Sequence, residues 1–254
     1  RCGHSYNNVR LMLTPGIGKP YDPISNTGVV GRNYAYQMSG GATLFFRDKN
    51  FNPFIGAGAN GSIIDDFAIN QIDFRKEGFI GGSYINAAMA NGQPIRNMPL
   101  PAGAPSWGAG WKKAVKDNYG HAMSIGSHGS NMSYRDCYLS LDPTYRDRFG
   151  LPLLRMTFNW NDNDIRMTQF MKKRIQEIVA VMKPDEAKYG FKDFGAKYDV
   201  RPYQTTHNVG GAIMGTDRTK SALNRYLQSW DVHNVFVMGA SAFPQNIQYN
   251  PTML

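Results

Sequence analysis

Residues 206–217 read THNVGGAIMGTD, and this segment is the most informative one in the chain. Its small and apolar residues predict a strand over 205–214, in which His207 is followed by Gly210 and Gly211. Because glycine carries no side chain, two glycines behind an imidazole leave room for a flat ligand. His207 is therefore the first candidate for a functional residue.

A second segment, residues 235–252, has the same character. Residues 235–244 read VFVMGASAFP, and residues 250–252 read NPT. The apolar start predicts a strand over 234–238 that runs into Gly239 and Ala240. A buried strand that ends in small residues, followed by a polar turn, is typical of a cofactor cradle closed by backbone amides.

The remaining sequence alternates short strands with a few helices. Apolar residues at three- and four-residue spacings predict a helix over 165–182, which ends before Pro184, and shorter helices are predicted over 7–13 and 110–118. Short apolar runs between turn residues predict strands over 42–46, 78–82, 121–127, 136–141 and 153–159. This order indicates an α+β fold with antiparallel sheets.

Composition is that of a folded, loop-rich protein. Of the 254 residues, 42% are hydrophobic and 13% aromatic, which excludes wholesale disorder, while 27 glycines and 14 prolines imply many turns. No run approaches the ~20 apolar residues that a membrane span needs. The net charge of +9 comes from dispersed basic residues, which predict a solvated face and not nucleic-acid binding. An anionic substrate, partner or membrane surface stays open.

Other chemistry-bearing patterns are incomplete. Residues 56–61 form a literal G-x-G-x-x-G, but Pro53 precedes it and no helical period follows, which predicts a glycine-rich turn and not a dinucleotide loop. The five histidines make no pair at i, i+4 spacing, so no metal site is predicted. Cys2 and Cys137 are expected to be ordinary thiols, with a single disulfide as the alternative.

The two C-terminal segments resemble the signature of the glucose–methanol–choline (GMC) flavoprotein oxidoreductases. Further segments resemble the gluconate 2-dehydrogenase subfamily and its sugar- and polyol-dehydrogenase relatives, namely VGRNY (residues 30–34), LPLLRMTFNW (151–160) and RYLQSWDV (225–232). The likeness covers essentially the whole chain.

This resemblance implies an architecture. Residues 1–30 would be part of the FAD-binding domain, residues 31–200 a substrate-binding domain with an antiparallel sheet and helices, and residues 201–254 the C-terminal FAD-binding and catalytic segment. The N-terminal Rossmann unit of the family has no counterpart here. We therefore expect the C-terminal part of a longer protein, which by itself binds FAD weakly or not at all and is inactive.

The resemblance also implies a reaction. FAD would oxidise a CH–OH group of a sugar, sugar acid or polyol by taking a hydride at N5. A neutral His207 would accept the hydroxyl proton, since imidazole has a reference pKa near ~6.5, and Asn250 would orient the same hydroxyl. The residues implied to contact the cofactor are Gly239, Ala240, Asn250, Pro251 and Thr252.

Partners and location follow only from the resemblance. Electrons would pass to a cytochrome c subunit or another acceptor, with a small accessory subunit, in the bacterial periplasm or at the periplasmic face of the inner membrane. Membrane contact would come only through a partner. The alternatives are an oxygen-using oxidase and a non-catalytic fragment that binds carbohydrate or a partner subunit. For an acidic substrate such as gluconate, the candidate basic residues are Arg32, Arg96 and Arg155.

Overall fold

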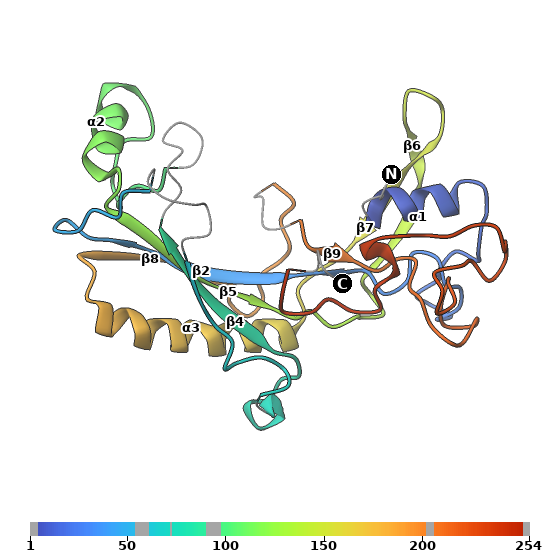
Figure 1. Ribbon diagram of the computed structural model, residues 1–254. Helices are drawn as coiled ribbons and strands as arrows, with labels where there is room; N and C mark the ends of the chain where they lie inside the picture. The colour runs from blue at the N-terminus through green and yellow to red at the C-terminus, as the bar shows by residue number, and fades with distance from the viewer. Residues whose placement is uncertain (1–4, 54–60, 72, 90–97, 202–205, 251–254) are drawn as a thin grey trace. The chain divides into compact units, whose positions relative to one another are not determined.

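The chain folds into two compact units, each assembled from separated stretches of sequence (Figure 1). The computed structural model describes residues 5–53, 61–71, 73–89, 98–201 and 206–250. The first unit comprises residues 1–38, 130–164 and 195–254, and the second comprises 39–129 and 165–194. Both ends of the chain thus belong to one unit, and residues 130–164 join them there. The assignment of cofactor and substrate to these units stays a prediction.

The second unit contains a five-stranded sheet with the strand order β3-β4-β5-β2-β8. Antiparallel pairing joins β3 to β4, β4 to β5 and β2 to β8, with Ile85 opposite Ser127 and Leu44 opposite Ala187. The strands are β2 (Met38–Phe45), β3 (Gly61–Ile64), β4 (Ser83–Met89), β5 (Ala122–Gly129) and β8 (Glu186–Gly190). A 3-10 helix, η1 (Phe74–Glu77), and helix α2 (Gly108–Asn118) lie in the connections.

Helix α3 (Asp162–Met182) lies along this sheet and supplies much of its core (Figure 1). Its apolar stripe was predicted from spacing, and Met171 and Ile175 are indeed buried against Leu44, Ile85 and Ile125. Asp162 and Asp164 occupy its first turn, where the positive end of the helix dipole favours acidic side chains. The expected antiparallel sheet with a covering helix is confirmed.

The first unit is held together by short elements. Helix α1 (Ser5–Leu13) buries Val9, Met12 and Leu13. Strand β1 (Ala35–Tyr36) pairs antiparallel with β9 (Asn208–Val209), β6 (Tyr138–Arg146) pairs antiparallel with β7 (Pro152–Thr157), and a 3-10 helix, η2, spans Ala240–Ala242. Aromatic rings close to Phe158 form a further cluster, made by Tyr34, Tyr36, Trp160 and Tyr198.

Two strand predictions are wrong and a third is confirmed only in part, and glycine conformation explains two of these three outcomes. Gly78 and Gly81 have φ angles of 80° and 118°, so residues 78–82 cannot run as a regular strand, and β4 starts only at Ser83. Gly210 and Gly211, with φ of 81° and 91°, stop the strand predicted over 205–214 after Val209.

The other wrong prediction is the strand over 234–238. Its backbone pairs with the neighbouring loop, where Ser229 N donates to Val235 O and Val237 N donates to Leu227 O, and Met238 O accepts from the Asn8 side chain. Residues 54–60 of the glycine-rich stretch lie outside the described residues. The residues that follow it, Gly61–Ile64, form strand β3 and not the helix that a dinucleotide loop requires. Among the described helices, none is both long enough and apolar enough to cross a membrane.

Candidate active site around His207

His207 directly precedes β9, and its backbone is held by two other segments of the first unit. Its carbonyl oxygen accepts a hydrogen bond from Gln37 N at 3.1 Å, because β1 and β9 are paired just beside it. The same oxygen accepts a second bond from Asn246 Nδ2 at 2.6 Å. Gln37 and Asn246 are both fully buried. The backbone of His207 is therefore held in place by Gln37 and Asn246, which come from opposite ends of the sequence.

The imidazole of His207 is also held. Its Nδ1 lies 2.6 Å from Oε1 of Gln37, a residue 170 positions away in the sequence. Burial lowers the pKa of His207 below its usual value. A lowered pKa keeps the imidazole neutral near pH 7, which is the state that can accept a proton from a hydroxyl.

A buried polar network supports the segment that carries Asn246. The backbones of Asn131 and Asn246 exchange hydrogen bonds at 3.2 and 3.3 Å. The Asn131 side chain accepts from Tyr36 N at 3.0 Å and donates to Asp164 Oδ2 at 2.6 Å. Tyr134 donates its hydroxyl to Asp164 Oδ1 at 3.0 Å. Burial raises the pKa of Asp164 to about 7, against the effect of these hydrogen bonds.

Gly210 and Gly211 are required for close packing, and not for ligand space as expected. A Cβ atom on Gly210 would lie 1.9 Å from Asn33 O, and a Cβ atom on Gly211 would lie 2.5 Å from Val9 Cγ2. The space beside these glycines is therefore filled by the chain itself. The expectation that they leave room for a flat ligand is wrong for both positions.

The predicted cofactor residues Gly239 and Ala240 lie directly against the His207 segment. Gly210 N donates to Ala240 O at 3.0 Å, and Ala212 N donates to Ser241 O at 3.0 Å. Gly239 has φ 99° and ψ −173°, a conformation that is essentially restricted to glycine. In the described part of the chain, the amide groups of Ala240 and Ser241 donate no hydrogen bond. These amides, on a sharp glycine turn, fit the contact with cofactor oxygens that was expected of the cradle.

Asn250 is exposed, and the segment before it is tied to the same glutamine as His207. Gln37 Nε2 lies 3.1 Å from Ile247 O, 3.3 Å from Gln248 O and 3.4 Å from Tyr249 O. Gln37 thus contacts both His207 and residues 247–249, so the segment directly before Asn250 lies close to His207. That the two side chains share one substrate oxygen stays a prediction. Pro251 and Thr252 lie outside the described residues.

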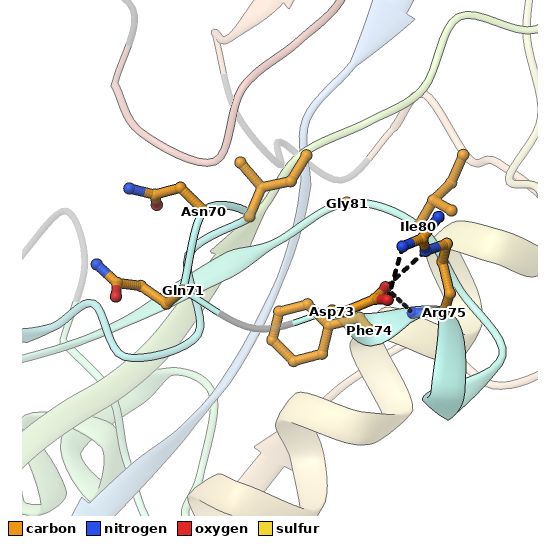
Figure 2. A pocket seen from close by; sticks show the side chains of 8 residues that line it. Asn70, Gln71, Asp73, Phe74, Arg75, Ile80 and Gly81 are labelled. Carbon is orange, nitrogen blue, oxygen red and sulfur yellow. Dashed lines mark hydrogen bonds and ion pairs between the residues drawn. The ribbon is translucent and has the colours of Figure 1, made fainter.

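The pockets found in the described part of the chain lie away from His207. In the second unit, a pocket of about 410 Å³ is lined by residues 69–71, 73–75, 80 and 81 (Figure 2). Figure 2 shows the Asp73 carboxylate facing the Arg75 guanidinium, and two of their hydrogen bonds measure 2.7 Å. Among the described residues, this pairing occupies the only charged groups of the lining, and no histidine, cysteine or serine faces the pocket.

Another pocket, of about 540 Å³, is a basic one in the first unit. Arg32, one of the candidates for binding an acidic substrate, lines it together with Lys19, Arg218 and Lys220, and Asp231 is its carboxylate. Of the other two candidates, Arg155 is part of β7, and Arg96 lies outside the described residues.

The cysteine and metal chemistry is limited. Cys137 is a buried free thiol whose pKa burial raises to about 11, which makes it a poor nucleophile. Cys2 lies outside the described residues. Across the described ranges, no group of three His, Cys, Asp or Glu side chains is arranged to hold a metal ion.

Sequence reasoning missed Gln37, Asn131 and Asp164, which are all fully buried. For Gln37 one signal was present, because it is the polar residue in the otherwise aromatic and apolar run Tyr34–Met38. A buried polar residue has to be hydrogen-bonded, so such an interruption marks a position with a specific partner. No comparable signal marks Asn131 or Asp164.

Comparison with known proteins covers this part of the chain. Residues 133–254, which include His207, Gly239 and Asn250, match the family model of the GMC oxidoreductases. These residues belong to that family, and the resemblance noted in the sequence is confirmed.

Curated relatives match along almost all of the chain. It is 53% identical over 248 residues to the gluconate 2-dehydrogenase flavoprotein of Pantoea cypripedii, a match that covers 97% of this chain and 40% of that protein. It is 25% identical to the 2-methyl-1,2-propanediol dehydrogenase of Mycolicibacterium austroafricanum, over 95% of this chain and 42% of that protein. Identity to the fructose dehydrogenase large subunit of Gluconobacter japonicus is 21%, over 96% and 42%. The chain therefore spans about two fifths of the length of these relatives.

Proposed function

We propose that the whole protein is an FAD-dependent dehydrogenase that oxidises a CH–OH group of a sugar, sugar acid or polyol. The observation that carries this proposal is that His207, half-buried and hydrogen-bonded to Gln37, lies in the segment that matches the GMC oxidoreductases. The names of the relatives support the substrate class, since they are dehydrogenases of gluconate, a diol and fructose. A flavin is supported in the same way by the name of the gluconate enzyme.

The residues of this chain would divide the work as follows. His207 takes the proton of the substrate hydroxyl, which its neutral imidazole can accept near pH 7. Asn250 orients that hydroxyl, since an amide can both donate to and accept from one oxygen. Gly239 and Ala240 hold the cofactor through the backbone. A bound flavin supplies the hydride acceptor.

We further propose the expected setting of the enzyme. Electrons leave to a cytochrome c subunit or a similar acceptor, a small accessory subunit accompanies the flavoprotein, and the complex works in the bacterial periplasm or at the periplasmic face of the inner membrane. Support for this part is the family resemblance, together with the word "subunit" in the name of the fructose relative.

The test uses the full-length protein. Its flavin is extracted and identified by mass, and flavin reduction is followed anaerobically with a panel of gluconate, fructose, glucose and 1,2-diols. We expect FAD, rapid bleaching by at least one polyhydroxy compound, and reoxidation by an artificial acceptor dye faster than by oxygen. Fast reoxidation by oxygen would instead define an oxidase. A protein with no flavin and no reduction would be a non-catalytic carbohydrate- or partner-binding protein.

A further inference from the structure

We propose that Gln37 is a positioning residue that fixes the tautomer of His207, with the proton on Nδ1 and the accepting lone pair on Nε2. This inference rests on the proposed role of His207 as the base. It starts from the contact between Gln37 Oε1 and His207 Nδ1, whose atoms lie 2.6 Å apart. The surroundings of Gln37 decide which of these two atoms donates and which accepts.

The orientation of the Gln37 amide is determined by three carbonyl oxygens. Its nitrogen faces Ile247 O, Gln248 O and Tyr249 O, which can only accept hydrogen bonds. Rotating the amide by half a turn would place its oxygen against these three oxygens and lose every one of the bonds. Because Gln37 is fully buried, no bulk water would compensate for that loss.

The tautomer of His207 follows directly. With its nitrogen committed to the carbonyls, Gln37 presents its oxygen to His207 Nδ1. An amide oxygen only accepts, so Nδ1 must carry the hydrogen. In a neutral imidazole the other nitrogen, Nε2, then holds the lone pair, and Nε2 is the atom that takes the substrate proton.

A neutral amide at this position also differs from the carboxylate that orients the histidine of many catalytic triads. A carboxylate beside Nδ1 would favour the imidazolium form and raise the pKa of the histidine. Gln37 orients the ring without adding charge. The imidazole of His207 therefore stays neutral down to a lower pH than it would beside a carboxylate. The same amide bonds to the carbonyl groups of residues 247–249. The Gln37 side chain therefore positions both His207 and the segment directly before Asn250.

The experiment compares Gln37→Glu and Gln37→Met in the full-length flavoprotein, with Gln228→Glu as the matched control. Gln228 belongs to the same unit and bonds to Asn224 and His233, away from His207. We expect Gln37→Glu to move the acidic limb of the pH profile for flavin reduction upward by about 1–3 pH units. Gln37→Met should slow reduction by about tenfold or more with little movement of that limb, because it removes the orienting acceptor and leaves the base. The control should change neither.

A spectroscopic readout keeps the tautomer separate from the proposed function. Long-range proton–nitrogen correlations on deuterated, ¹⁵N-histidine-labelled protein report which ring nitrogen is protonated, and His207→Asn assigns the signal. We expect protonated Nδ1 in the wild type and a mixture of tautomers in Gln37→Met. Protonated Nε2 in the wild type would overturn the inference, even if the protein folds and reduces its flavin. An unmoved acidic limb in a folded Gln37→Glu protein would overturn it as well. If no substrate reduces the flavin, the proposed function fails, while the tautomer is still decided by the nitrogen signal.

Discussion

Gly210 and Asn33 meet backbone to backbone: a Cβ atom on Gly210 would lie 1.9 Å from the carbonyl oxygen of Asn33. Gly210 also has a φ of 81°, which places it in the left-handed region. The contact lies just beyond the pairing of β1 with β9, where Ala35 is opposite Val209. It brings the segment after His207 so close to the segment before Gln37 that only glycine fits between them.

The first prediction concerns this close approach. Gly210→Ala should destabilise the protein by about 3 kcal/mol or more, since a left-handed alanine costs about 1–2 kcal/mol and the clash adds a similar amount. Chemical unfolding of the full-length protein measures the loss. The matched control is Gly16→Ala, where φ is 77° but nothing lies within 4 Å, so only the conformational cost applies. Equal losses at the two positions would show that the Asn33 contact does not matter.

A second prediction concerns the base. In the full-length enzyme, His207→Asn should slow flavin reduction by roughly 10²–10⁴-fold, the usual contribution of a positioned general base. Rapid mixing under anaerobic conditions measures this step. His233→Asn is the control, because His233 is exposed and lies outside the Gln37 network. If the His207→Asn protein reduces its flavin at the wild-type rate, the proton goes to another group.

Asn250 should matter less than His207. Asn250→Ala removes the orientation of the hydroxyl but leaves the base in place, so we expect a smaller loss in the rate of flavin reduction than for His207→Asn. The same rapid-mixing assay compares the two variants at saturating substrate. A loss for Asn250→Ala as large as that for His207→Asn would mean that the two side chains do not have separate roles.

The fourth prediction concerns pH and stability. Burial raises the pKa of Asp164 to about 7 in the folded protein, from 3.8 as the ordinary value. Because the unfolded state loses this proton first, the group stabilises the fold below about pH 4, and the contribution is lost as the pH rises through 7. The loss is on the order of 4 kcal/mol, at about 1.4 kcal/mol per pH unit.

Urea unfolding between pH 4 and 8 tests this expectation. The decline of unfolding free energy with pH should be much smaller in Asp164→Asn than in the wild type. Asp48→Asn, at an exposed position, is the control and should keep the wild-type slope. A wild-type slope in Asp164→Asn would assign the pH dependence to another residue.

Local pattern was enough for the elements whose partners are their own neighbours in sequence. The helix over 165–182 could be predicted because Ile165, Met171 and Ile175 repeat along one face, and the structure buries all three. His207 and Gly239 were singled out through long motifs that a resemblance could carry, and their roles stay predictions. In contrast, residues 78–82 and 234–238 are apolar enough for strands. Apolar character alone shows neither the positive φ angles of Gly78 and Gly81 nor whether residues 234–238 have a strand to pair with.

The partners of the buried polar side chains at the site were out of reach for the same reason. Gln37 is defined by partners at 207 and at 247–249, and Asn131 by partners at 164 and 246. Whether a polar side chain is buried depends on such distant donors and acceptors, not on its neighbours in the chain. Gly210 and Gly211 were correctly singled out, but the reason that glycine is required there is packing against Asn33 and Val9.

The assembly of the first unit from three separated stretches has a consequence for synthesis on the ribosome. Strand β1 cannot find β9, nor Gln37 its histidine, until residues beyond 207 have been made. Residues 39–129 are translated long before that, and pairing over such sequence distances is slow because the loop must close first. The aromatic and apolar surface of residues 30–38 therefore stays without its final partners during much of translation. Chaperone binding during synthesis would be expected at this stretch in particular.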